Sequence, residues 1–580
     1  MKHTPLVNSV SVDKSLLLSF IALFYAGFTG CSSSSSSSSV SVDSVETCYD
    51  VSLTYTGFNK TSRLCTTREH GGVNGLGVYR FLRFSLPVTA NVSIQVNTVS
   101  GINPSDPDLV LFKNGDVLEA ALSTTANSER LQITLGAGDY AVELSEYRYT
   151  VESSKSNVSL TGIVTSPADE SSHADINLPA AIDVVSSTPC SSGNDKVVSG
   201  VVTYDRVPHI VTGLDYNNII ALPVQEAVVS VICNGQEYST GVTDQSGAYN
   251  LIFPANQESF VRVRAQLKKT GTPAWDFSVV SNTVAGKPTY VMQSSAITGS
   301  VNITEDLHAE SGWNGVSYIA EKRVAAPFAI LDSVRKAKNK VLFESPNAQF
   351  PQLNINWSEL NTTTSGSVLL GQIGTSFFDG SEIFLLGMQD NDTDEYDEHV
   401  IIHEWGHYFE ANFSRSDSIG GAHTSGDILD VRVAFGEGFG NAFSAMVLDD
   451  AMYIDVTGLS QSEGFFIDVE NNNCINPGWY SECSVHSILY DLYDTNDDGT
   501  DTLALGFSPI YAVLTTNQKV TPAFTSIFSF IQSLKTIYLP SGIDQITGAQ
   551  NIDPVLDMYG DSQLTNNPGD TNKLPLYQAY

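Results

Sequence analysis

The motif H-E-x-x-H at residues 403–407 restricts the fold of this chain more than any other feature of the sequence. On a helix, His403 and His407 lie one turn apart on the same face, so both imidazoles can reach one zinc ion. Glu404 stands one residue further round the helix, where it can accept a proton from water without being a ligand. The apolar run Val400-Ile401-Ile402 gives this helix a side to bury.

The alternative is an amphipathic helix whose two histidines are satisfied inside a core. The chain has only 10 histidines, so a chance match to the motif is infrequent. Gly406, a residue that weakens a helix interior, indicates close packing against another element at that point. The context of the motif therefore favours a zinc site.

Length and composition predict a multidomain globular protein. With 580 residues, of which 42% are hydrophobic, the chain can form two or more domains with cores of their own. Its net charge is −35, from 64 acidic and 29 basic residues. This excess of acid disfavours nucleic acids and anionic membrane surfaces as partners and favours solubility in a salty or extracellular setting.

Residues 1–30 have the pattern of a secretory signal peptide. Basic residues precede an apolar run from Leu16 to Phe28, which is short for a membrane-spanning helix. The ending Gly30-Cys31 resembles the lipobox of bacterial lipoproteins, and that resemblance implies a lipid on Cys31. Ordinary cleavage by signal peptidase nearby is the alternative.

An unbroken serine run at residues 32–39 follows Cys31. It cannot form a core, so residues 31–45 are expected to be a flexible tether. The N-terminal pattern therefore predicts an exported protein that is lipid-anchored through Cys31 to a bacterial membrane, expected to be the outer one. Its domains would face the periplasm or the exterior.

The cysteine count agrees with export. Seven cysteines become six when Cys31 carries lipid, and an even number suits disulfides in an oxidising compartment. Among the possible connectivities, the simplest hypothesis joins sequence neighbours: Cys48 with Cys65, Cys190 with Cys233, and Cys474 with Cys483.

Residues 46–165 read as a β-sandwich. Polar and apolar residues alternate in Val92–Val96 and Arg130–Leu135, as in strands with one buried face. The runs Asp106–Gly115 and Leu135–Tyr140 resemble the pre-peptidase C-terminal type of β-domain, which accompanies secreted bacterial proteases. A generic sandwich is the alternative.

Residues 166–195, rich in Ser, Pro, Ala and Asp, read as a linker. Residues 196–300 then form a second β-domain. Its T-D-x-x-G-x-Y turn, at Thr243–Tyr249, resembles carboxypeptidase regulatory-like sandwiches, which are usually non-catalytic spacers. Neither β-domain contains a catalytic constellation.

Residues 301–580 predict an α+β domain with a mainly helical lower lobe. A helix over Tyr318–Val341 and strands at Leu353–Trp357 and Ser381–Gly387 precede the motif helix. That order resembles the upper lobe of zincin metallopeptidases, in which an edge strand, here Ser381–Gly387, can pair with an extended substrate. The lower-lobe helices are expected at 432–448, 484–493 and 522–538.

A catalytic zinc site needs a third protein ligand. Metzincins place a third histidine ligand at the position that is Phe413 in this chain. The metzincin ligand set is therefore excluded. The segment Glu437-Gly438-Phe439 resembles the ligand helix of gluzincins, the class that includes the thermolysin-like peptidases, and this resemblance implies Glu437 as the ligand. His423, in the glycine-containing segment between the two helices, is the alternative.

The remaining roles follow from the same resemblance. Glu404 would be the general base, and a His or Tyr would stabilise the oxyanion. His486 and Tyr490 are four residues apart, hence on one helical face, and are the candidates. The alternative is that His486 and Tyr490 are ordinary helix residues without a catalytic role.

Two acidic loops are candidate calcium sites. Asp494–Gly499 matches the first half of an EF-hand loop, but the glutamate required at the last position is Leu505, with Asp501 as a substitute. Asp390–Glu395 is the second loop. Solvated loops are the alternative for both.

The sequence thus predicts two all-β sandwich domains followed by a zincin-like metallopeptidase domain that cleaves protein or peptide substrates with zinc. The rival interpretation is a non-enzymatic surface adhesion or scaffold protein with a structural or inactive zinc site. Glu404 argues against the rival, because a structural site needs no base.

Overall fold

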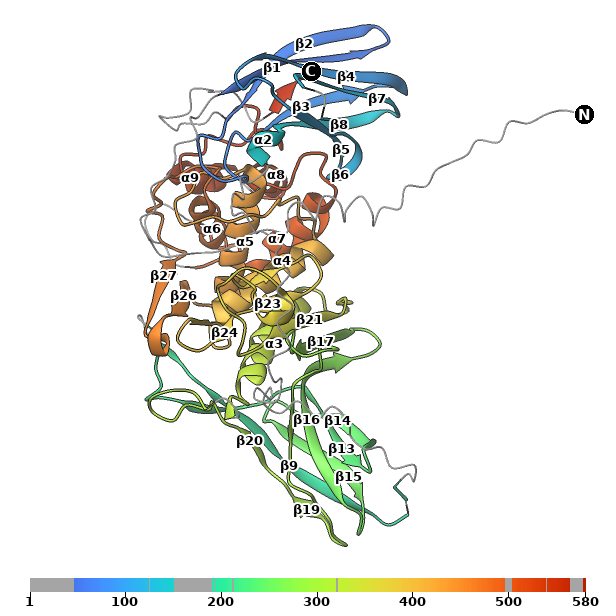
Figure 1. The fold of residues 1–580 in the computed structure, drawn as a ribbon, viewed down its shortest axis with the longest axis vertical. Coiled ribbons are helices and arrows are strands. Elements are labelled where there is room, and N and C mark those ends of the chain that lie inside the picture. The colour runs from blue at the N-terminus through green and yellow to red at the C-terminus, as the bar shows by residue number, and fades with distance from the viewer. Residues whose placement is uncertain are drawn as a thin grey trace, which may run out of the picture.

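The computed structural model describes residues 46–124, 126–150, 190–191, 193–210, 213–319, 322–495, 503–538, 540–563 and 577–580. The predicted signal peptide, Cys31, the serine tether and most of the linker lie outside these ranges. Figure 1 shows a β-sandwich at one end of the long axis, helices in the middle and further β-structure at the other end. The multidomain, β-rich organisation predicted from the sequence is confirmed.

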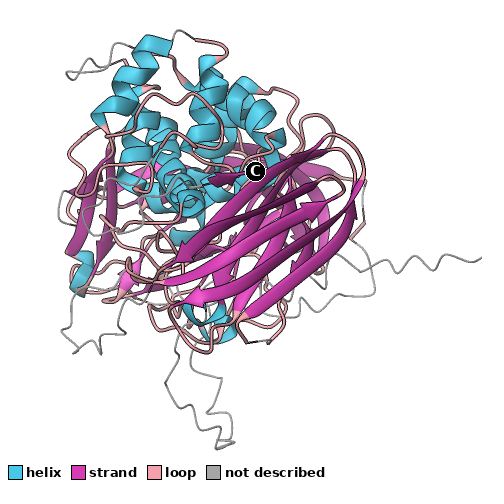
Figure 2. Ribbon diagram, turned by 90° about the horizontal axis from the view of Figure 1, so that it is seen from above, coloured by secondary structure: helices cyan, strands magenta, loops and turns pink. Residues whose placement is uncertain are grey.

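Two sheets form the first sandwich, with strand orders β2-β1-β4-β7 and β28-β3-β8-β5-β6. Val92, Ile94 and Val96 of β4 point inward and are buried, as expected of a strand with one core face. Strand β28 pairs in parallel with β3, so the C-terminal residues complete this domain (Figure 2). The strands are β1 (Thr47–Tyr55), β2 (Phe58–Thr66), β3 (Tyr79–Leu86), β4 (Ala90–Ser100), β5 (Pro107–Lys113), β6 (Asp116–Ala121), β7 (Ser128–Leu135), β8 (Gly138–Glu146) and β28 (Tyr577–Ala579).

The second β-domain shares its larger sheet with the helical part. A smaller sheet has the order β12-β9-β15, with β19 and β20 beside β9. The larger sheet runs β14-β13-β16-β17-β21-β23-β22 and continues past residue 300, where the sequence places a domain boundary. The parallel pairs β17–β21 and β21–β23 make this connection. Both sheets contribute to one hydrophobic core with the helices.

The bounds of these strands are β9 (Asp195–Arg206), β12 (Ile220–Pro223), β13 (Ala227–Cys233), β14 (Gln236–Val242), β15 (Ala248–Pro254), β16 (Ser259–Lys269), β17 (Trp275–Val280), β18 (Val291–Gln293), β19 (Ile303–Thr304), β20 (Leu307–Ala309), β21 (Leu353–Trp357), β22 (Phe377–Phe378) and β23 (Ile383–Leu385). A small separate sheet has the order β24-β25-β26-β27. Its strands are β24 (Gly387–Met388), β25 (Asp392–Thr393), β26 (Met452–Thr457) and β27 (Glu463–Asp468).

The predicted helices are present, but two begin later than expected. The helix expected from Pro522 begins at Ile527. The helix expected from Tyr318 begins at Ala326, because Pro327 stands in its first turn, where a missing N–H costs no hydrogen bond. No helix in the described ranges has both the length and the apolarity to cross a membrane. The α-helices of the described residues are α2 (Tyr147–Thr150), α3 (Ala326–Glu344), α4 (Glu398–Phe413), α5 (Val431–Leu448), α6 (Glu482–Asp491), α7 (Phe507–Val513), α8 (Ile527–Lys535) and α9 (Pro540–Ala549). Helices α7 and α9 were not predicted.

Glycines set the packing of the motif helix α4 against α5. A Cβ atom on Gly406 would lie 3.4 Å from the Cα of Gly440, so the two backbones approach closely there. A Cβ on Gly440 would lie only 2.7 Å from Cε1 of His403. Gly440 therefore makes room for that imidazole, and the close contact expected at Gly406 is present.

The larger sheet ends at β14 on one side and at β22 on the other. The edge beside the motif helix α4 is β22, not the segment Ser381–Gly387 that the sequence predicts. Strand β23, within that segment, pairs with β21 on one side and with β22 on the other. The edge strand was missed because Phe377-Phe378 is too short to show alternation. At this end of the sheet, a substrate strand could therefore pair only beyond β22.

The first sandwich contacts the loop between α4 and α5. The backbone N–H of Asp430 donates to the carbonyl of Asn74 at 2.7 Å, and the N–H of Leu76 donates to that of Ile428 at 3.0 Å. The Asn74 side chain donates to the carbonyl of Ala422 at 3.1 Å. This loop is thereby supported by a domain distant in sequence.

The three predicted disulfides are confirmed: Cys48–Cys65, Cys190–Cys233 and Cys474–Cys483. The first joins two paired strands, because Cys48 and Cys65 stand opposite each other in β1 and β2. The third closes a short loop that ends in the first turn of α6, next to the site described below.

Candidate metal centre and cleft

The structure brings His403, His407 and Glu437 together from two packed helices. The Nε2 atoms of the two histidines are 3.1 Å apart. The Oε2 atom of Glu437 lies 3.2 Å from Nε2 of His403 and 3.4 Å from Nε2 of His407. These three side chains form one compact group of ligand atoms.

This donor set fits a zinc ion. Ligand atoms bound tetrahedrally at about 2.0–2.2 Å lie about 3.3–3.6 Å from one another, close to the separations of the three side chains here. Two neutral imidazoles and one carboxylate are donors that zinc accepts. Burial by itself would raise the pKa of Glu437, but His423 and His407 hold it well below the usual carboxyl range. Glu437 is therefore ionised.

Both histidines are oriented through their second nitrogen. Nδ1 of His403 lies 2.8 Å from Oδ1 of Asn441, and Nδ1 of His407 lies 3.4 Å from Oε2 of Glu410. Such partners fix the tautomer and leave Nε2 free to bind a metal. Asn441 was not predicted as a site residue, although it follows Glu437 by one helical turn, a spacing that places it on the same side of α5.

Glu404 lines a cavity of about 250 Å³ together with the three ligands. It is 8% exposed. Burial raises the pKa of its carboxyl, while the two motif histidines act in the opposite direction. The backbone of Phe378, in edge strand β22, hydrogen-bonds to it. The carboxylate is thus fixed between the metal centre and the sheet edge.

His423 also lines the cavity, on the loop between α4 and α5. Its Nε2 lies 3.8 Å from Oε2 of Glu437 and 3.5 Å from Oε2 of Glu482. Burial would lower the pKa of this imidazole, but Glu437 and Glu482 raise it to about 9. His423 is outside the compact group of ligand atoms and stands beside it, facing Glu437.

His486 and Tyr490 are not among the residues that line the cavity. Nδ1 of His486 lies 3.4 Å from Nδ2 of Asn441, behind the metal centre. Burial, with a contribution from His403, lowers the pKa of His486 to about 3. Tyr490 packs against Tyr493, with ring centroids 5.7 Å apart. The structure therefore brings neither predicted oxyanion donor to the cleft.

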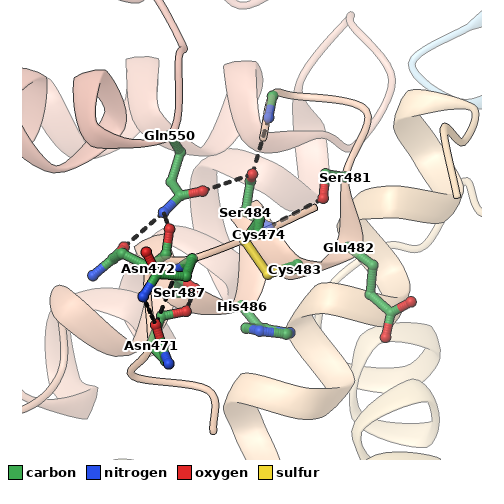
Figure 3. Close-up of a disulfide and its surroundings, with 12 residues drawn as sticks. Asn471, Asn472, Cys474, Ser481, Glu482, Cys483, Ser484, His486, Ser487 and Gln550 are labelled. Carbon is green, nitrogen blue, oxygen red and sulfur yellow. Dashed lines mark hydrogen bonds between the residues drawn. A yellow bond between two sulfur atoms is a disulfide. The ribbon is translucent and has the colours of Figure 1, made fainter. Parts of the chain in front are cut away.

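Glu482, the first residue of α6, reaches the cleft instead. Its Oε1 accepts from Nδ2 of Asn441 at 2.6 Å. Figure 3 shows the Cys474–Cys483 disulfide next to this helix start, with the Glu482 side chain directed away from it. Ser481 caps the start of helix α6, because its side chain accepts from the N–H of Ser484. The disulfide and this cap together fix Glu482.

Three aspartates form a second acidic group beside the centre. Asp392 and Asp394 belong to the predicted calcium loop Asp390–Glu395, and Asp455, on β26, was not predicted. The other predicted calcium loop, from Asp494, lies mostly outside the described residues.

One comparison with known families supports a relation to metallopeptidases. Residues 335–528, from within α3 to within α8, match the profile of the family described as the Mycolysin C-terminal domain. The matched region contains all residues of the metal centre. The match covers only the C-terminal part of the chain.

The other comparisons add no argument. No curated protein shows significant sequence similarity to the chain. Among solved structures, a chain from work titled "Ca2+-stabilized adhesin helps an Antarctic bacterium reach out and bind ice" has 9% identity and a TM-score of 0.10, over 46% of this chain and 66% of that one. A TM-score of 0.10 does not define a common fold.

Proposed function

We propose that this protein is a zinc-dependent peptidase that hydrolyses peptide bonds. One observation carries the proposal: the Nε2 atoms of His403 and His407 and a carboxylate oxygen of Glu437 converge beside the buried Glu404 in one cavity. When bound there, a zinc ion supplies a Lewis acid that lowers the pKa of water to about 7 and polarises a carbonyl oxygen. The family match of residues 335–528 supports this function.

Glu404 is the proposed general base and acid. It is no member of the ligand group, yet it is adjacent to His403 in sequence and lines the same cavity. It would accept the proton of the attacking water and return it to the leaving amine. The hydrogen bond from the backbone of Phe378 holds the carboxylate in place for both transfers.

His423 is the proposed donor to the developing oxyanion, in place of His486 and Tyr490. It lies on the cavity wall, whereas the other two do not. Its Nε2 is 3.8 Å from a carboxylate oxygen of Glu437, so it faces the metal centre. An N–H donor at this position stabilises charge that develops in the transition state.

The cavity also separates this proposal from the scaffold interpretation. A structural zinc site is closed by four protein ligands, whereas a catalytic one keeps an open position. Within the described residues, the ligand group contains three side chains and opens into the cavity. This arrangement favours an enzyme.

Export with a lipid on Cys31 is a separate proposal. Three disulfides support an oxidising compartment. Mass spectrometry of the N-terminal peptide of the mature protein tests it, with a lipidated Cys31 as the expected result.

The function itself is tested with the mature chain on unfolded casein. Removing zinc should abolish cleavage, and adding one equivalent of zinc back should restore it. A zinc-loaded, folded protein that cleaves neither casein nor a peptide library would contradict the proposal and favour the scaffold.

A further inference from the structure

Three carboxylates line the cavity next to the metal centre. Asp392 and Asp394 lie on and just after β25, and Asp455 lies on β26. One oxygen from each lies within 4.8 Å of the others. Strands β25 and β26 pair antiparallel through Asp392 and Thr457, and this pairing brings like charges together. Like charges at such a distance require a proton or a cation between them.

No described residue supplies that cation. The Oδ1 atoms of Asp392, Asp394 and Asp455 are buried and have no hydrogen-bond partner among the described residues. Asp394 is only 2% exposed. Burial, together with the neighbouring Asp397, raises the pKa of Asp394 to about 8. Asp397 is itself hydrogen-bonded to His209 and to the N–H of Val456. As a carboxyl group, it adds no positive charge to the cluster.

The cavity wall between this cluster and the metal centre is aromatic. The Tyr453 ring centroid lies 6.2 Å from that of His403 and 6.4 Å from that of Phe465, with which it stacks. Phe465 stands opposite Asp455 in the β26–β27 pair. Tyr453 and Asp455 are two residues apart on one strand face, about 6.8 Å along β26. That spacing is about the length of a lysine or arginine side chain.

We propose that Asp392, Asp394 and Asp455 form a subsite for the lysine or arginine side chain of a peptide substrate. The proposal rests on the peptidase function proposed above and names its substrate class. The aliphatic stem would lie along Tyr453 and Phe465, and the charged head would meet the carboxylates. No lysine or arginine is among the described residues that line the cavity, so the incoming side chain has no competitor there.

A divalent cation fits the surroundings of the cluster less well. Calcium takes six to eight oxygen ligands. Beside these aspartates the cavity is lined by the Ser376 hydroxyl, which donates to Asp394, and by Leu386 and Phe465, which offer no oxygen. The aromatic wall matches the apolar stem of a basic residue and has no role in binding an ion.

Peptide binding to the zinc-loaded Glu404→Gln protein tests the subsite without requiring turnover. Two libraries of random octapeptides are compared, one with a single arginine and one with citrulline at the same positions. Citrulline keeps the shape of arginine and removes its charge. The arginine peptides should bind at least about tenfold more tightly, since hydrogen bonds to charged groups are worth more than neutral ones. Equal binding of the two libraries would overturn the subsite.

Variants locate the effect and separate it from the peptidase proposal. Asp455→Asn in the Glu404→Gln background should bring the arginine-to-citrulline ratio close to one, whereas the exposed Glu463→Gln on the same hairpin should leave it unchanged. Asp455→Asn should fold as well as its parent, because it removes a like charge; Asp392→Asn is the second variant if it does not.

Two other outcomes separate this proposal from its alternatives. If the protein binds calcium, Asp455→Asn abolishes that binding, and both libraries bind equally, the cluster is an ion site and not a side-chain subsite. Loss of casein cleavage in wild type with the arginine preference intact would contradict only the peptidase function.

Discussion

Arg432 donates from Nη1 to Oε2 of Glu143 at 2.7 Å, and this buried pair joins the first sandwich to the helix that carries Glu437. The guanidinium also lies over the rings of Phe81 and Phe524, at 5.0 and 4.9 Å. Arg432 stands in the first turn of α5. The first sandwich therefore stabilises the position of a proposed metal ligand and is more than a spacer.

Glu143→Ala should destabilise the whole protein. It leaves Arg432 buried with only Asp430 as a carboxylate partner, and breaking a buried pair costs about 3–5 kcal/mol. Urea unfolding measures the change, with the exposed Glu119→Ala on β6 as control. A loss below about 1 kcal/mol would mean that the pair does not join the two parts energetically.

The zinc content of two variants distinguishes between Glu437 and His423 as the third ligand. Glu437→Ala should lose stoichiometric zinc, because only three protein ligands hold the ion. His423→Ala should retain zinc but lose about 10²–10³-fold in turnover if it serves the oxyanion. Metal analysis of both dialysed proteins decides between them, and the reverse pattern would make His423 the ligand.

The stability of the first sandwich should respond to pH through Asp108. Burial and neighbouring carboxylates raise the pKa of this residue to about 7. The folded state then binds a proton that the unfolded state releases near pH 4, so ionisation costs stability as pH rises from about 4 to about 7. The melting temperature of Asp108→Asn minus that of wild type should be near zero at pH 4 and positive above pH 7. The exposed Asp116→Asn is the control, and a difference that stays constant with pH would contradict this assignment.

The disulfide beside α6 should matter for catalysis. Replacing Cys474 and Cys483 with serine frees the segment that positions Glu482, whose Oε1 accepts from Asn441 at 2.6 Å. Casein cleavage should fall severalfold under conditions in which the variant stays folded. The matched control replaces Cys190 and Cys233 in the second β-domain, where equal loss would show a general effect of stability.

Local patterns in the sequence predicted α3 to α6 and α8 approximately, but not α7 and α9. They also placed His403 and His407 together, whereas Glu437 was expected from the resemblance to gluzincins. The H-E-x-x-H spacing fixes two imidazoles on one face, and Gly406 correctly indicated a close helix contact. The same reasoning placed His486 and Tyr490 on one face of a helix but could not say which element that face meets. In the structure, Asn441 stands between His486 and the cleft.

Contacts between distant segments could not be predicted. Asp455 joins Asp392 and Asp394 only because β26 pairs with β25, and nothing in its own sequence context marks it. The parallel pairing of β28 with β3 has the same origin. The continuous sheet through β17 and β21 likewise depends on pairing across the expected domain boundary.

The most direct test of the proposed mechanism compares wild type with Glu404→Gln in one experiment, measuring zinc content and casein cleavage on the same samples. Glutamine keeps the size and shape of the side chain but cannot accept the proton. The two proteins should hold equal zinc, and Glu404→Gln should cleave at least about 10²-fold more slowly. Equal rates for the two zinc-loaded proteins would contradict the proposed role of Glu404.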